Sequence, residues 1–296
     1  MTIVRIVRHV SVSVFALAWM AGASASAQAG GGDWQKSYPV SGKASLILSS
    51  GDASLEMRSC GECHEVRVRV EWRDRKPADY TINESQSGDH VNFELKEKPH
   101  LGIHVRFGNL RQPYVTVETP TALDLVAQTS DGALKLSGVQ GNLELHTSDG
   151  DVDVADVGGA VHLTASDGSI KIQNVTGTLE SRSSDGHASV EGRFTALQVH
   201  TSDGNLDVTL ADGSHLNTAS RIESSDGRVM VRLPRTMAVD LDVHTSDGQI
   251  DCELPLTMDG FNTEHNSGHN LRGHVNGGGT PLTIHTSDGN VKIEAS

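Results

Sequence analysis

Two cysteines and a histidine near the start of the chain, Cys60, Cys63 and His64, spell C-x-x-C-H. This is the spacing of c-type haem attachment, in which the histidine binds the iron. The motif lies between two charged, alternating stretches, SLEMRS and EVRVRVEW, with few aromatic side chains to line a haem pocket. In an oxidising compartment the two cysteines would close a disulfide across a hairpin turn. A disulfide is therefore favoured, with haem attachment and metal or redox chemistry as alternatives, and Cys252 is predicted to be a buried free thiol.

A second set of candidate residues is a column of aspartates. The tetrapeptide TSDG, or a near copy, recurs down the chain, and the first five copies of its aspartate are eighteen residues apart. Glycine accepts a positive φ in a tight corner, and the carboxylate can accept hydrogen bonds from nearby backbone N–H groups. Ca²⁺ could bind such a column, as in the β-roll repeats of secreted toxins, but those repeats place aspartate in both turns of a coil. Turn chemistry is therefore favoured over Ca²⁺ binding for Asp131, Asp149, Asp167, Asp185, Asp203, Asp226, Asp247 and Asp288.

A third set lies three residues before these aspartates, where His200, Glu223 and His244 occupy matching positions. If their coils stack in sequence order, the three side chains share one outward face at about 4.8 Å spacing and could bind Zn²⁺ or Cu²⁺. A solvated polar face explains the same pattern and is favoured. Metal binding by these residues is the alternative.

The elements that must position these side chains are short strands. Three and five residues after each motif aspartate the residues are mostly aliphatic, as at Val152 and Val154, and the residues between them are mostly polar. Alternation with period two is typical of a strand with one buried face. A second alternating stretch precedes each motif, so each repeat holds two strands and two tight turns. We therefore predict an all-β fold, a right-handed β-solenoid (β-helix-like) with coils of roughly 18 to 23 residues.

The chain divides into three predicted parts. Residues 1–29 have a basic start, an apolar run and small residues suited to cleavage, which predicts a signal peptide. Residues 30–120 alternate like strands at irregular spacing, and we interpret them as irregular β coils of the same array or a cap, with a separate small β-domain as an alternative. Residues 121–296 form the regular SDG-repeat solenoid.

The composition narrows the range of partners. The chain has 24 Lys and Arg residues against 38 Asp and Glu, a formal net charge of −14. Such an acidic surface repels nucleic acid and anionic lipid. Aromatic residues make up 4% of the chain, which leaves few rings for stacking on sugars or bases. No stretch after the signal peptide reaches the roughly 20 apolar residues of a membrane helix. We expect an exported protein of the periplasm, cell surface or extracellular space.

Three stretches resemble a known family. They are a strand pair from Gly51 to Met57, the segment VTVETPTALDLVAQTSDG from Val115 to Gly132, and the SDG-x-φ-x-φ coils that follow. Together they resemble the bacterial "putative adhesin" β-strand repeat proteins, an exported family of unknown function, over nearly all of the chain after the signal peptide. The resemblance implies a repeat fold and an adhesin-like role, and the family brings no catalytic motif.

These observations predict a non-catalytic surface or envelope interaction scaffold without a cofactor, whose partner is a protein or a cell-surface component. A divalent-cation module with Ca²⁺ or Zn²⁺ on the Asp or His columns is the first alternative. A carbohydrate-active β-helix enzyme is the second, disfavoured because the tight, uniform turns leave little room for a cleft. The final strand, NVKIEA, ends the repeat array, so residues 290–295 are predicted to form an open sheet edge that could pair with a second copy.

Overall fold

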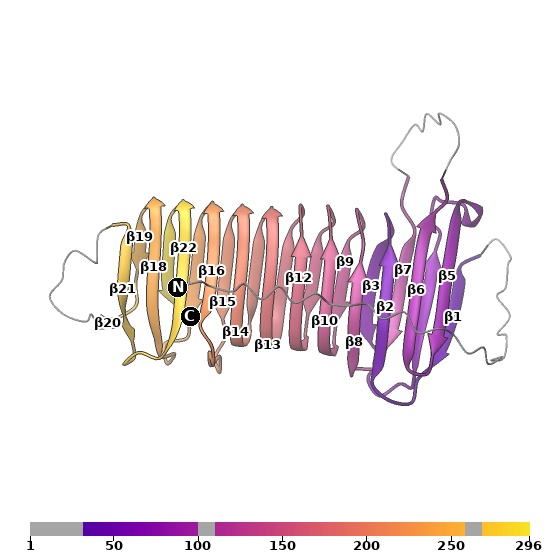
Figure 1. Ribbon diagram of the computed structural model, residues 1–296, viewed down its shortest axis with the longest axis horizontal. Helices are drawn as coiled ribbons and strands as arrows, with labels where there is room; N and C mark the ends of the chain where they lie inside the picture. Colours follow the sequence, from indigo (N-terminus) through magenta and orange to yellow (C-terminus); the bar gives the residue numbers. More distant parts are fainter. Residues whose placement is uncertain (1–31, 100–109, 258–267) are drawn as a thin grey trace, which may run out of the picture.

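The computed structural model describes residues 32–99, 110–257 and 268–296. The predicted signal peptide, residues 1–29, lies outside them. Figure 1 shows the strands standing side by side in one long row. The only other regular element in the described ranges is a short 3-10 helix, η1 (Pro77–Asp79), so the all-β prediction is confirmed. A search of these ranges finds no helix long and apolar enough to cross a membrane.

Within the described residues the strands form one 23-stranded sheet. In chain order they are β1 (Trp34–Pro39), β2 (Ala44–Ser50), β3 (Ser54–Ser59), β4 (Glu65–Glu71), β5 (Tyr80–Ser87), β6 (His90–Glu97), β7 (Tyr114–Thr119), β8 (Leu123–Gln128), β9 (Leu134–Ser137), β10 (Gln140–Thr147), β11 (Val152–Ala155), β12 (Gly158–Ala165), β13 (Ile170–Asp185), β14 (Ala188–Asp203), β15 (Leu206–Leu210), β16 (Ser220–Asp226), β17 (Val229–Leu233), β18 (Val239–Asp247), β19 (Ile250–Cys252), β20 (Leu256–Thr257), β21 (Asn270–Val275), β22 (Thr280–Asp288) and β23 (Val291–Ala295). Their pairing, rather than their order in the chain, determines which side chains become neighbours.

The central array consists of parallel strands that pair equivalent repeat positions. Val152 of β11 pairs with Leu134 of β9 on one side and with Ile170 of β13 on the other. The strands that precede the TSDG corners, from β8 through β10 and β12 to β13 and β14, pair in the same way. Along β11, Val152 and Val154 are buried and Asp153 between them is half-exposed. The predicted alternation is confirmed, and equivalent positions of neighbouring coils form columns.

The TSDG corners are held by a hydroxyl and a glycine. The Thr147 hydroxyl accepts a hydrogen bond from the Gly150 N–H at 3.2 Å and donates one to the Ser130 carbonyl of the neighbouring coil at 3.3 Å. Hydroxyls of later corners repeat the second bond to the corner serine carbonyl of the neighbouring coil. A Cβ at Gly150 would overlap the Gly132 carbonyl oxygen, so only glycine fits. At this corner the hydroxyl therefore takes the acceptor role that the sequence assigned to the aspartate carboxylate.

At the C-terminal end the coils are out of chain order. β22 lies between β16 and β18, and β23 lies between β17 and β19, as Figure 1 shows for β22. The last coil therefore fills a slot between two earlier coils, where Ile284, Val291 and Ile293 are fully buried. On the other side of β18, the antiparallel strands β21 and β20 cover the end of the stack.

This insertion shows that the predicted open edge at residues 290–295 is wrong. Val291 of β23 pairs with Val229 of β17 on one side and with Ile250 of β19 on the other. Residues 291–293 are thus paired on both sides within the chain, and Glu294 and Ala295 are paired with β17 on one side, so the strand offers no continuous open edge to a second copy. The physical reason is that a slot between two coils satisfies the backbone polar groups on both edges of a strand, whereas an end position satisfies one.

The N-terminal end is permuted in the same manner. β2 pairs with both β6 and β8, and β3 pairs with both β7 and β9, so the first coil lies one place inside the end of the stack. All of these pairs are parallel and join the N-terminal part to the array. Antiparallel pairs then add β4 beside β7, β1 beside β4, and β5 beside β6. Non-repeating strands therefore cover this end.

Candidate functional site

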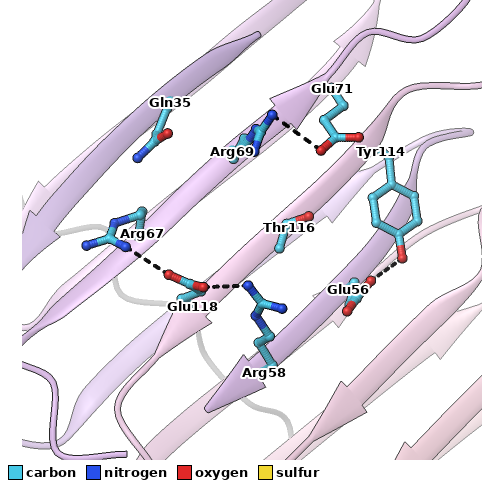
Figure 2. A pocket seen from close by; sticks show the side chains of 9 residues that line it. All are labelled: Gln35, Glu56, Arg58, Arg67, Arg69, Glu71, Tyr114, Thr116 and Glu118. Atoms are coloured by element: carbon cyan, nitrogen blue, oxygen red, sulfur yellow. Dashed lines mark hydrogen bonds and ion pairs between the residues drawn. The ribbon is translucent and has the colours of Figure 1, made fainter. Parts of the chain in front are cut away.

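A depression of about 400 Å³ crosses β1, β4, β7 and β3, and we call it the N-terminal groove (Figure 2). Strand pairing sets its side chains in rows, in which Arg67 opposes Glu118 and Glu118 opposes Arg58. The groove therefore combines side chains from strands that are far apart in the sequence. Its lining consists of Gln35, Glu56, Arg58, Arg67, Arg69, Glu71, Tyr114, Thr116 and Glu118.

Opposite charges are paired in the N-terminal groove. Figure 2 shows the Glu118 carboxylate between two guanidinium groups, 2.6 Å from that of Arg58 and 2.9 Å from that of Arg67. The hydrogen bond from Arg58 lowers the pKa of Glu118 below its usual value, and the charges of both arginines add to this effect. Arg69 forms a further ion pair with Asp33 at 2.7 Å. Glu118 therefore stays ionised and is unsuited to act as a general acid near neutral pH.

Tyr114 is the aromatic side chain of the groove. Its hydroxyl donates a hydrogen bond to the Glu56 carboxylate, and the Arg73 guanidinium lies 4.2 Å from the centre of its ring. Burial, followed by the bond to Glu56, raises the pKa of Tyr114 to about 12. The phenol is therefore neutral at physiological pH. Fixed, mutually paired polar groups of this kind suit recognition of a polar partner better than proton transfer.

Three further depressions run end to end along one outer face of the array. They measure about 360 Å³ over β10, β12 and β13, about 270 Å³ over β13, β14 and β16, and about 510 Å³ over β16, β22, β18 and β21. The first two share Glu180 and Arg182, and the last two share Arg221 and Glu223. Together they form one continuous surface, which we call the long trough.

The long trough is lined by histidines, arginines and carboxylates in contact with one another. His146 Nε2 lies 2.8 Å from Glu144, and His162 Nδ1 lies 3.1 Å from Glu180 on the neighbouring coil. Further along, Arg221 forms an ion pair with Glu223 on the same strand, β16, and an arginine of β21 forms one with an aspartate of β18. The face is therefore polar, shallow and charge-paired along its length.

The structure separates two of the predicted metal ligands. His200 pairs in register with Glu223, and its Nδ1 lies 3.7 Å from the carboxylate. The next side chain in this column is His285 of the inserted β22, and His244 follows one strand further on. The predicted consecutive stack of His200, Glu223 and His244 is therefore wrong, because the insertion reorders the coils. His285 was not included in that set, although its place before the last TSDG corner was a usable signal.

The motif aspartates do form a column. The corners at Asp149 and Asp167 each donate a backbone N–H to the corner before, as from Asp149 to the Ser130 carbonyl at 2.9 Å. Asp131 belongs to that preceding corner. The later members pair in register in the order Asp185, Asp203, Asp226, Asp288 and Asp247. The last two are reversed relative to the sequence because β22 is inserted.

Like charges in this column affect one another. Desolvation at the corner, and then the neighbouring aspartates, raise the pKa of both Asp185 and Asp226. Across residues 32–99, 110–257 and 268–296, no three His, Cys, Asp or Glu side chains converge closely enough to hold a metal ion. The column therefore consists of neighbouring carboxylates, and at Asp185 and Asp226 the neighbours disfavour the ionised form.

Cys60 and Cys63 form a disulfide with their Cα atoms 5.8 Å apart, in the turn between β3 and β4. The side chain of His64 is exposed, and its carbonyl accepts a hydrogen bond from the Val40 N–H at 2.9 Å. With both sulfurs in the disulfide, neither is available as a thiol for haem or metal. Cys252 has a free thiol that is half-buried, and burial raises its pKa.

The chain is thus a stack of β coils with an inserted last coil, and its class is that of solenoid-like all-β proteins. The profile of the Toastrack DUF4097 family matches residues 43–294, so the chain belongs to this family. The family resemblance seen in the sequence is confirmed. No curated protein matches the chain.

Solved structures from three bacteria are similar to the chain. A "putative cell adhesion protein" from Clostridium sporogenes is 11% identical, covers 88% of this chain and 99% of its own, and has a TM-score of 0.26. A "putative adhesin" from Bacteroides fragilis is 10% identical, with 89% and 97% covered and a TM-score of 0.38. A "putative adhesin" from Parabacteroides distasonis is 11% identical, with 90% and 98% covered and a TM-score of 0.36.

Sequence reasoning missed the N-terminal groove entirely. The signal that could have found it is the alternation of charge in EVRVRVE, where Arg67 and Arg69 occupy outward positions of one strand. The pairing of Arg67 with Glu118 could not be assigned, because β4 pairs antiparallel with β7, which follows it by more than forty residues.

Proposed function

We propose that the protein is an exported, non-catalytic interaction scaffold, adhesin-like in role, which binds a protein or another component of the cell surface or envelope. The observation that carries this proposal is the long trough, because it continues from β10 to β21 along the stack. Its lining is polar and its depressions are shallow. A surface of this shape suits an extended partner that contacts several coils at once, and not a small molecule enclosed in a pocket.

Binding is better supported than catalysis. A general acid in a glycosidase needs a carboxyl group with a raised pKa beside the scissile bond. In the N-terminal groove the pKa of Glu118 is lowered by Arg58, and the carboxylates with raised pKa values that we describe, Asp185 and Asp226, lie at exposed corners outside the trough. The Asp and His columns would add cation binding as a second property of the scaffold.

The proposal includes the remaining architectural predictions. Residues 1–29 are removed on export, residues 30–120 form the irregular part, and residues 121–296 form the regular array. The coils are right-handed, as parallel crossovers almost always are, and span roughly 18 to 23 residues, the spacing of the repeated aspartates. The protein acts in the periplasm or at the cell surface. Sequencing the N-terminus of the exported protein tests the cleavage, and an experimental structure tests the handedness.

The central experiment measures binding of the labelled mature protein, residues 30–296, to cells and envelope fractions of its native host. We expect saturable binding that the double variant Arg182→Glu, Arg221→Glu in the trough weakens by about tenfold. The matched control, Lys135→Glu, Lys171→Glu, reverses two exposed charges on the other outer column and should bind as the wild type does.

Two outcomes would contradict this proposal. If no fraction binds saturably, the scaffold function fails. If both double variants bind equally well or equally poorly, the trough is not the binding surface. Incubation with envelope polysaccharides should release no new reducing or unsaturated ends, and their release would favour the enzyme alternative.

A further inference from the structure

The inserted coil brings two histidines together at the end of the long trough. His244 of β18 and His285 of β22 pair in register, and their rings are stacked with centroids 5.2 Å apart and planes 4° apart. Both rings are half-exposed at the floor of the depression of about 510 Å³. Strands paired in register lie about 4.8 Å apart, so a turn of the His285 ring out of the stack brings one of its nitrogens within reach of an ion bound by His244.

A neighbouring amide orients the His244 ring. Its Nδ1 lies 2.6 Å from Asn270 Oδ1 on the antiparallel strand β21. An amide oxygen only accepts hydrogen bonds, so Nδ1 carries the proton and Nε2 presents its lone pair. Metal-binding histidines are oriented in this way by an acceptor on the nitrogen that faces away from the ion.

His285 has the freedom that the second ligand of such a site needs. Among the residues that the structure describes, its ring contacts His244 by stacking and makes no hydrogen bond. On its other side lies Glu223, whose carboxylate is engaged by Arg221 at 2.7 Å. The local donor set is therefore two imidazoles, with water to fill the other coordination positions.

We propose that His244 and His285 bind a divalent transition-metal ion, ligated by Nε2 of His244 and a ring nitrogen of His285. Imidazole donors favour Cu²⁺, Ni²⁺ and Zn²⁺, and the affinity follows the usual order with Cu²⁺ highest. Ca²⁺ and Mg²⁺ prefer oxygen ligands and do not bind here. The ion joins β18 to the inserted β22, so it stabilises the inserted arrangement. Metal binding here does not require the partner proposed for the trough, and the two would share this end of the surface.

The test is a calorimetric titration of the untagged mature protein with Ni²⁺. We expect His244→Asn and His285→Asn each to weaken binding by more than about tenfold, and Asn270→Ala to weaken it less, because both ligands remain but one loses its orientation. The matched control is His162→Asn on the same outer face, where the neighbouring position in register on β13 is Glu180 and not a second histidine. This control should bind Ni²⁺ as the wild type does.

Two further measurements distinguish Ni²⁺ binding at this site from nonspecific Ni²⁺ binding to other histidines. Ni²⁺ should broaden the ring NMR signals of His244 and His285 before those of other histidines. It should also raise the melting temperature of the wild type and of the His162 variant, but not that of either ligand variant. Equal Ni²⁺ affinity in the wild type and both ligand variants, or equal weakening in the control, would overturn the proposal. Each variant is first compared with the wild type in EDTA, where equal melting temperatures show that folding is unaffected.

Discussion

The TSDG corners of the array and the N-terminal groove arrange charge in opposite ways. In the array, parallel strands pair equivalent repeat positions, so Asp226 lies between Asp203 and Asp288. In the N-terminal part, strands of different sequence pair, so that Glu118 lies between Arg67 and Arg58. Adjacent like charges destabilise a sheet and adjacent opposite charges stabilise it. A charged corner copied in register therefore carries an electrostatic penalty that the differing strands of the groove avoid.

Deleting residues 279–296 should have the largest effect and would test whether the last coil is truly internal. The deletion removes four fully buried aliphatic side chains, whose burial stabilises the fold by about 1.5–3 kcal/mol each: Leu282, Ile284, Val291 and Ile293. It also exposes a strand edge on each of the two neighbouring coils. We expect the C-terminal coils to lose cooperative folding. Hydrogen exchange should show loss of protection in β17 (Val229–Leu233). If β17 stays protected, the last coil lies at the end of the stack and the inserted order is wrong.

The next effect should be Gly204→Ala at a corner of the array. Gly204 has φ 149°, and an added Cβ would overlap the Gly186 carbonyl oxygen of the neighbouring coil. We expect a loss of about 3 kcal/mol in the free energy of unfolding, measured by urea denaturation. Gly51→Ala is the matched control, since open space surrounds its added methyl and the change should be within about 0.5 kcal/mol. Similar losses at both sites would mean that the corners do not require glycine for close approach.

Glu118→Gln should weaken the N-terminal part in a pH-dependent way. The pKa of Glu118 is lowered in the folded state, so its contribution to stability is present above the unfolded pKa and is lost as the pH falls through the folded pKa. We expect a loss of about 1 kcal/mol at pH 7 and a smaller loss at pH 3. Denaturant unfolding at the two pH values checks this, with Glu62→Gln in an exposed turn as control. A loss of the same size at both pH values would show that charge pairing is not the cause.

Asp226→Asn should have the smallest effect and the opposite sign. Desolvation at the corner and its aspartate neighbours raise the pKa of Asp226 in the folded state, so its favourable contribution is present below the unfolded pKa and is lost as the pH rises through the folded pKa. We expect the variant to melt slightly above the wild type at pH 7, and the difference to shrink toward pH 3. The exposed Asp212→Asn serves as control. A variant less stable than the wild type at pH 7 would show that the carboxylate supports the corner despite its neighbours.

Within the array, much of the fold could be predicted because it depends on local patterns. Val152 and Val154 alternate with polar residues, and glycine follows aspartate at every TSDG corner, so strands and turns can be read from one repeat at a time. The bond that the Thr147 hydroxyl donates was not predicted, because its acceptor, the Ser130 carbonyl, belongs to the neighbouring coil. The groove at Glu118 was missed for the same reason, since both of its arginines come from other strands.

The sequence by itself determined the strands, the corners, the buried columns and the family of this protein, because each depends on residues close together in the chain or repeated along it. Only the tertiary structure decided the order of the coils. Repeats of similar sequence can stack in more than one order, and the arrangement adopted pairs the last strand on both sides at residues 291–293. This stacking order places His285 between Glu223 and His244 and so forms the histidine pair, which a prediction that stacks the coils in chain order would not contain.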